Sequence, residues 1–100
     1  MSNYTKDHEF FKRADEIISL ANTQCDSTAN ESVSLSLLFA AARFNAFIVA
    51  SSVRNIEELK AEKPEAVKYF KEQYEKMLVE NIDEYIKNYS NNIEKQRSQY

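Results

Sequence analysis

The amino-acid sequence predicts an all-α, single-domain protein, and three observations support this prediction. The 100 residues include no glycine and a single proline, Pro64. Tight hairpins and phosphate-binding loops need the positive φ angles that glycine supplies, so small β-sheets and nucleotide-binding glycine motifs are excluded. Apolar residues recur at helical spacing in three stretches. We expect a three-helix antiparallel bundle, with or without a short fourth segment, that assembles as a dimer.

The first helix is expected over residues 6–24. Its start can be capped by Thr5 or Asp7, and the polar stretch 25–32 that follows it has the composition of a loop. The apolar side chains form one stripe at i, i+3, i+4 spacing: Phe10, Phe11, Ala14, Ile17, Ile18 and Ala21.

The second helix is expected over residues 31–52, with Thr28 or Ser32 as its cap. At about 100° per residue it has two apolar faces separated by two polar strips. A surface helix needs one apolar face, so this helix should be central and covered on both sides. The faces consist of Val33, Leu37, Phe44 and Ile48 on one side and Leu35, Leu38, Ala42, Ala46 and Val49 on the other.

The third helical region begins at Asn55, which has capping spacing to Glu58. Because a residue before proline is disfavoured in helical geometry, we expect a break or kink near Lys63. This gives a short piece at 56–62 and a long helix at 64–90. The domain then covers residues 1–89, followed by a polar tail at 91–100.

Two polar residues interrupt the apolar run FAAARFNAFIVA in the second helix, namely Arg43 and Asn45. A central arginine costs about 2.5–3.5 kcal/mol in membrane insertion, so a buried helix of a soluble protein is favoured over a membrane span. A buried arginine needs a partner, and Asp15 is the first candidate. In that case Arg43→Ala should cost about 3–5 kcal/mol. The alternative is an open pocket in which Arg43 binds an anion.

A candidate polar cluster, structural or ligand-binding, contains the side chains that border the apolar stripes. The two asparagines within apolar surfaces are interpreted as hydrogen-bonded core amides that set helix register. No residue is predicted to be catalytic. The cluster consists of Arg43, Asn45, Asp15, Asn22, Asn81 and Tyr74.

Composition also limits the cofactors and partners. A single histidine and a lone Cys25 make a metal site or an internal disulfide improbable, and no cofactor is expected. The net charge of −3 does not favour nucleic-acid binding. The polar N-terminus has no apolar segment of a signal peptide, so we expect a cytoplasmic protein.

Several short segments resemble a family of small bacterial proteins, mainly proteobacterial, known only as a domain of unknown function (family 3144). The resemblance covers roughly residues 9–89, and it implies a helical bacterial protein without adding an activity. Pro64 and the polar tail after Tyr89 depart from the family pattern. The segments are RAD (13–15), LAN (20–22), AARFNAF (41–47), ELK (58–60), YF (69–70), KML (76–78) and EN (80–81).

The two-faced second helix and the longer third helix favour a non-enzymatic interaction or oligomerisation module, expected to be a homodimer. One alternative is a binder of small anionic ligands, or an enzyme, with its site around Arg43. Another is a small regulator that docks onto a different protein.

Overall fold

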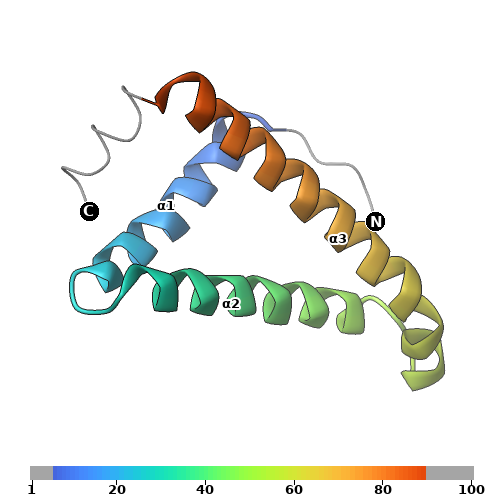
Figure 1. Ribbon diagram of the computed structural model, residues 1–100. Helices are drawn as coiled ribbons and strands as arrows, with labels where there is room; N and C mark the ends of the chain where they lie inside the picture. Colours follow the sequence, from blue (N-terminus) through green and yellow to red (C-terminus); the bar gives the residue numbers. More distant parts are fainter. Residues whose placement is uncertain (1–5, 90–100) are drawn as a thin grey trace. The chain divides into compact units, whose positions relative to one another are not determined.

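The computed structural model describes residues 6–89, which form three α-helices and no β-strand (Figure 1). The helices are α1 (His8–Cys25), α2 (Asn30–Ser51) and α3 (Ile56–Lys87). The all-α prediction is therefore confirmed for this part of the chain. The chain divides into two compact units, Met1–Ala46 and Phe47–Tyr100.

Helix α1 begins at an aspartate cap. The Oδ1 atom of Asp7 accepts a hydrogen bond from the backbone N–H of Phe10, at 2.9 Å. This satisfies one of the amides that a helix start leaves without an intrahelical partner. Asp7 is thus the cap, while the other candidate, Thr5, lies outside the described residues.

The helix ends are closed without left-handed residues, as expected of a chain that lacks glycine. No described residue has a positive φ angle. After α1, Asp26 N–H donates to the Thr23 carbonyl at 3.2 Å. After α2, Ser52 N–H donates to the Val49 carbonyl at 3.1 Å, and the Ser52 hydroxyl donates to the same carbonyl at 2.8 Å. These bonds to the third preceding residue satisfy carbonyls that a helix end would otherwise leave open.

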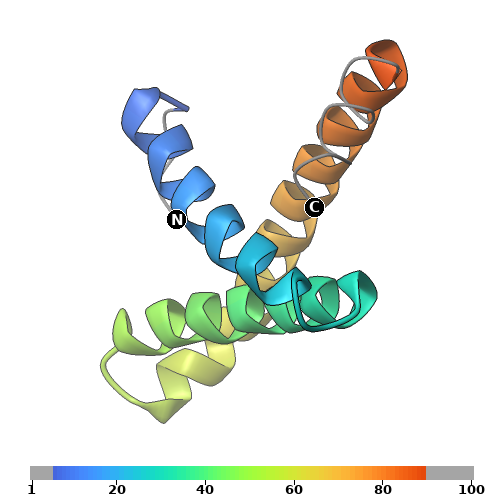
Figure 2. The same cartoon turned by 90° about the vertical axis from the view of Figure 1, so that its left-hand side faces the viewer.

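Helix α3 runs without interruption through Pro64. Of the two expectations for the region of Lys63, a break or a kink, the break is wrong, and so is the separate piece at 56–62. The helix ends at Lys87, and position 90 lies outside the described residues. Proline lacks an N–H, so the carbonyl of Lys60 loses its intrahelical donor. Figures 1 and 2 show the consequence, a change of direction in the yellow-green first turns of α3. Two turns already formed before Pro64 let the helix bend where a break was expected.

Among the described residues, few apolar side chains are buried, and two of them lie near the turns. Val33 is buried in the first unit, and Val49 and Ala66 are buried in the second. Val33 follows the first turn and Val49 precedes the second, where the chain reversal brings neighbouring segments close. Val33 and Val49 are therefore buried close to the two connections, while Ala66 is buried further along α3, beyond Pro64.

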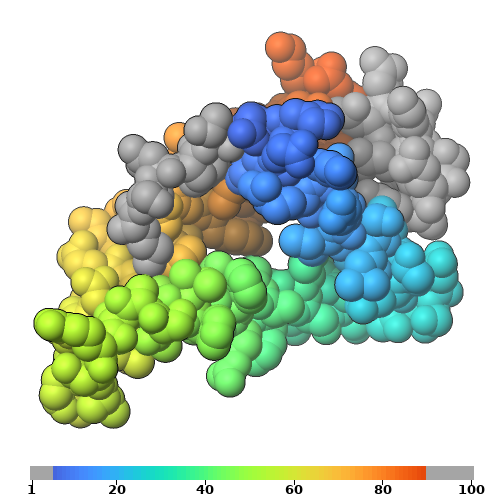
Figure 3. Space-filling view, turned by 180° about the vertical axis from the view of Figure 1, so that it is seen from behind, coloured from blue at the N-terminus to red at the C-terminus, as the bar shows by residue number. Residues whose placement is uncertain are grey.

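Within each unit taken by itself, little of α2 has the coverage on both sides that its sequence pattern predicts. Of the nine residues assigned to its two apolar faces, only Val33 and Val49 are buried. The other seven are exposed, and Figure 3 shows α2, in green, at the molecular surface. The periodicity correctly identified two apolar faces, but it carries no information on which neighbours cover them.

The position of Pro64 generates a stability prediction. Pro64→Ala restores the hydrogen bond to the Lys60 carbonyl and removes the ring clash, so it should stabilise the protein by about 1–3 kcal/mol. Urea unfolding measures the change. Ala61→Ser, at an exposed position of the same helix, is the control and should shift stability by less than about 0.7 kcal/mol. A loss of stability in Pro64→Ala would show that the bend itself is needed for packing.

Candidate functional site

Arg43 is exposed in the structure, which corrects the prediction of a buried ion pair. No carboxylate among the described residues forms a salt bridge with it, and Asp15, the expected partner in the same unit, is itself exposed. The side chain of arginine is long enough to carry its charge into water from the edge of an apolar face. The polar strip at Arg43 is therefore open and not closed by a carboxylate.

The six residues of the candidate polar cluster are divided between the two units. Asp15, Asn22, Arg43 and Asn45 belong to the first unit, where the two asparagines are half-buried. The remaining two, Tyr74 and Asn81, belong to the second unit and are exposed. Neither unit by itself contains the whole cluster.

Asn81 was expected to be a core amide, and the structure places it on the surface. Its Nδ2 atom donates to the Met77 carbonyl one turn earlier, at 2.7 Å. This local bond satisfies the amide within its own helix. The register-setting role that was inferred from its place in an apolar stripe therefore has no support.

A shallow hollow lies on α1, and its walls come from this helix alone. It includes Asp15 but not Arg43. One lysine, one histidine and two acidic side chains line it, so groups of both charge types lie close together and neither an anion nor a cation is strongly favoured. The lining residues are His8, Phe11, Lys12, Asp15, Glu16 and Ser19.

The described part of the chain has no group of residues suited to holding a metal ion, and its cysteine is not paired in a disulfide. No group of three or more histidine, cysteine, aspartate or glutamate side chains in residues 6–89 is placed to hold a metal ion. Cys25 is a free, half-buried thiol at the last position of α1.

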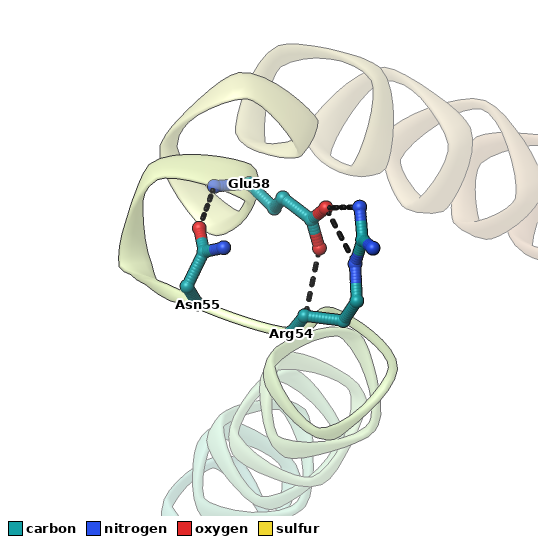
Figure 4. Close-up of polar contacts among 3 residues, drawn as sticks. All are labelled: Arg54, Asn55 and Glu58. Atoms are coloured by element: carbon teal, nitrogen blue, oxygen red, sulfur yellow. Dashed lines mark hydrogen bonds and ion pairs between the residues drawn. The ribbon is translucent and has the colours of Figure 1, made fainter.

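The best-defined polar arrangement is the one at the start of α3, shown in Figure 4. The Asn55 Oδ1 atom accepts from the Glu58 backbone N–H at 2.9 Å, which confirms the predicted cap. The Glu58 carboxylate binds Arg54 in three ways. Oε1 accepts from the Arg54 backbone N–H at 2.7 Å, while Oε2 accepts from Nε at 2.9 Å and from Nη2 at 2.5 Å.

These contacts lower the pKa of Glu58 below the ordinary carboxyl value. The cause is first the hydrogen bonds from the Arg54 side chain and then the bond from its backbone N–H. Both oxygens of the carboxylate are engaged in closing the turn, so the arrangement is a helix cap. The i, i+4 spacing of Arg54 and Glu58 was the sequence signal for this pair, and the sequence analysis missed it.

Comparison with known proteins finds a family and a solved structure. The family model described as "Protein of unknown function (DUF3144)" matches residues 10–86, which confirms the resemblance seen in the sequence. An NMR structure of the protein NB7890A from Shewanella sp is 36% identical, with a TM-score of 0.72. That match covers 89% of this chain and 93% of the Shewanella chain. None of the curated proteins compared with the chain matches it.

The Glu58 contacts predict a pH-dependent contribution to stability. Because the pKa is lowered in the folded state, the stabilisation is present above the unfolded pKa, about 4.3, and is lost as the pH falls through the folded value. Glu58→Gln should therefore lower the urea midpoint at pH 7 and much less at pH 3. Glu57→Gln, in the same helical turn, is the matched control. An equal effect of Glu58→Gln at both pH values would contradict this role.

The exposure of Arg43 predicts a small effect of its removal. Arg43→Ala should change the free energy of unfolding by less than about 0.5 kcal/mol, as is usual for surface positions. Denaturant unfolding at neutral pH measures this change. A loss of about 3–5 kcal/mol would instead reveal a buried, partnered guanidinium.

Proposed function

Because the chain belongs to the DUF3144 family of proteins of unknown function, we propose a role from the properties of its surface. The protein is a non-enzymatic oligomerisation and interaction module. Its three helices form an antiparallel bundle that assembles as a homodimer in the cytoplasm.

The observation that carries this proposal is the small amount of apolar burial. In the described residues, the buried side chains are two valines and one alanine, and no large side chain is fully buried. Leucine, isoleucine and phenylalanine side chains are exposed on each of the first two helices, and leucine, isoleucine and tyrosine on α3. Exposed apolar surface of this extent is typical of interaction sites.

Stability leads to the same proposal. A helix–turn–helix corner with one or two buried side chains cannot offset the roughly 1–2 kcal/mol of backbone entropy lost per ordered residue. The helices need further apolar contacts, from the rest of the chain and from a partner. A second copy is the partner that always accompanies the chain, and closed two-fold pairs are the commonest assemblies of soluble proteins.

The site around Arg43 gives less support to a ligand-binding or enzymatic role. An anion site requires a concave pocket with convergent polar groups. The hollow on α1 does not include Arg43, and the polar cluster is divided between two units. Within residues 6–89, neither unit by itself therefore contains the full set of residues expected for a site around Arg43.

Helix α2 also meets the length and hydropathy of a membrane span. Its 22 residues include an apolar window with a mean hydropathy of 1.8, of which 6% is buried. One such helix is weak evidence, because central helices of soluble bundles pass the same test. Arg43 and Asn45 near its middle oppose insertion, so we favour coverage of α2 by protein.

Light scattering after size-exclusion chromatography tests the proposal. For a monomer of 11.7 kDa, the expected result is twice that mass at tens of micromolar, with dissociation on dilution. A monomer mass at all concentrations would overturn the proposal. Recovery of the native protein only in a detergent-soluble membrane fraction would do the same and would favour the span.

A further inference from the structure

We propose that α3 bends as a hinge at Pro64, so that its long C-terminal part can change direction relative to the turn that precedes the helix. Residues 56–63 of α3 are named the short arm, and residues 64–87 the long arm. Both arms and the preceding turn lie in the second unit, Phe47–Tyr100. The inference therefore concerns this unit alone, and it does not rest on the proposed dimer.

The backbone of α3 has its weakest point where the two arms meet. Pro64 has no N–H, so the Lys60 carbonyl lacks its usual donor, and the proline ring crowds the same carbonyl. The helix continues there but changes direction, as the yellow-green first turns of α3 show in Figures 1 and 2. Because α3 contains no glycine or serine and is α-helical throughout, the proline is the remaining usual cause of a bend.

The side chains around Pro64 do not tie the two arms together. Residues three or four positions apart are neighbours on a helix surface, where opposite charges attract and like charges repel. None of the pairs at this spacing that join the short arm to the long arm has opposite charges, and Glu62 with Glu65 has like charges. Residues 61–65 are also exposed, so within the unit little packing fixes the angle between the arms.

The short arm, by contrast, is held to the turn by several local bonds. The Asn55 side chain accepts from the Glu58 N–H at 2.9 Å, and the Asn55 carbonyl accepts from the Leu59 N–H at 3.1 Å. The Glu58 carboxylate in turn accepts from the backbone N–H and the side chain of Arg54. The turn and the short arm thus form one body, the long arm forms a second, and Pro64 lies between them.

This arrangement allows the long arm to change direction without breaking the bonds at the turn. A hinge needs only a few residues that absorb the change, between two elements that stay intact. The long arm can then pack at more than one angle against the rest of the chain or against a partner. An unbroken helix of 32 residues without the proline would resist such bending.

Residual dipolar couplings of the full chain in solution test the hinge directly. If α3 moves at Pro64, the backbone N–H couplings of the short arm and of the long arm should give alignment tensors of different magnitude. In Pro64→Ala the missing hydrogen bond is restored, so both arms should fit one tensor. Lys63→Ala, at the neighbouring exposed position, keeps the proline and is the matched control. It should behave like the unmodified chain.

Amide hydrogen exchange locates the motion along the helix. The amide of Glu65 follows the hinge, and the amide of Glu75 lies well inside the long arm, at a similar distance from the other end of α3. Protection of Glu65 should be at least about tenfold lower than that of Glu75, because local opening exposes the amides beside the hinge. The ratio should approach one in Pro64→Ala. Because it is a ratio, a general gain of stability in that variant does not affect it.

Three outcomes would overturn the inference. A single alignment tensor for both arms in the unmodified chain would show a fixed bend. Equal protection of Glu65 and Glu75 would show that the helix does not open beside the proline. Different alignment of the two arms that persists in Pro64→Ala would show that the proline is not the cause. None of these results changes the mass that tests the proposed dimer.

Discussion

The burial of apolar side chains at the two ends of α2 is the constraint on which the rest of this structure depends. Burying a valine contributes about 1.5–3 kcal/mol, and the described residues bury only Val33, Val49 and Ala66. That contribution is far below the entropy cost of ordering three helices. The helices therefore depend on covering the apolar surface between the turns. The same surface that gives the chain an all-helical sequence pattern is the one on which the proposed pairing with a second copy rests.

The polar groups at the turns form hydrogen bonds with residues close to them in sequence. The turns can therefore form whether or not the apolar faces of the helices are packed. Asp7 and Asn55 cap the starts of α1 and α3 through their own side chains. Ser52 closes the end of α2, and Arg54 with Glu58 closes the second turn. Since these bonds connect residues within four positions of each other, they form without long-range contacts. The surfaces between the corners are mainly apolar or charged, with a few polar side chains such as Asn45 on α2.

The parts of the structure that the sequence predicted well are those with local causes. Helical periodicity and the absence of glycine predicted three helices, and the Asn55–Glu58 spacing predicted the cap that is observed. The break at Lys63 was wrong because the preference of a pre-proline residue is weaker than the continuity of a helix that already has two turns. The pairing of Arg43 was wrong because periodicity gives the direction of a side chain on its helix but not the neighbours in that direction. The Arg54–Glu58 pair also had a local cause, its i, i+4 spacing, and so was predictable from the sequence although it was not predicted.

Because Arg43 is exposed, its charge has a different structural role from the one expected of a buried arginine. In a buried position it would be a structural charge that requires a carboxylate. On the surface of an otherwise apolar helix, it makes insertion into a bilayer costly while leaving the adjacent apolar residues able to pack against protein. Asn45, half-buried on the other side of α2, adds a second polar group that lipid cannot satisfy. Two residues within the run FAAARFNAFIVA thus support the proposal that protein, and not lipid, covers the most apolar of the described helices.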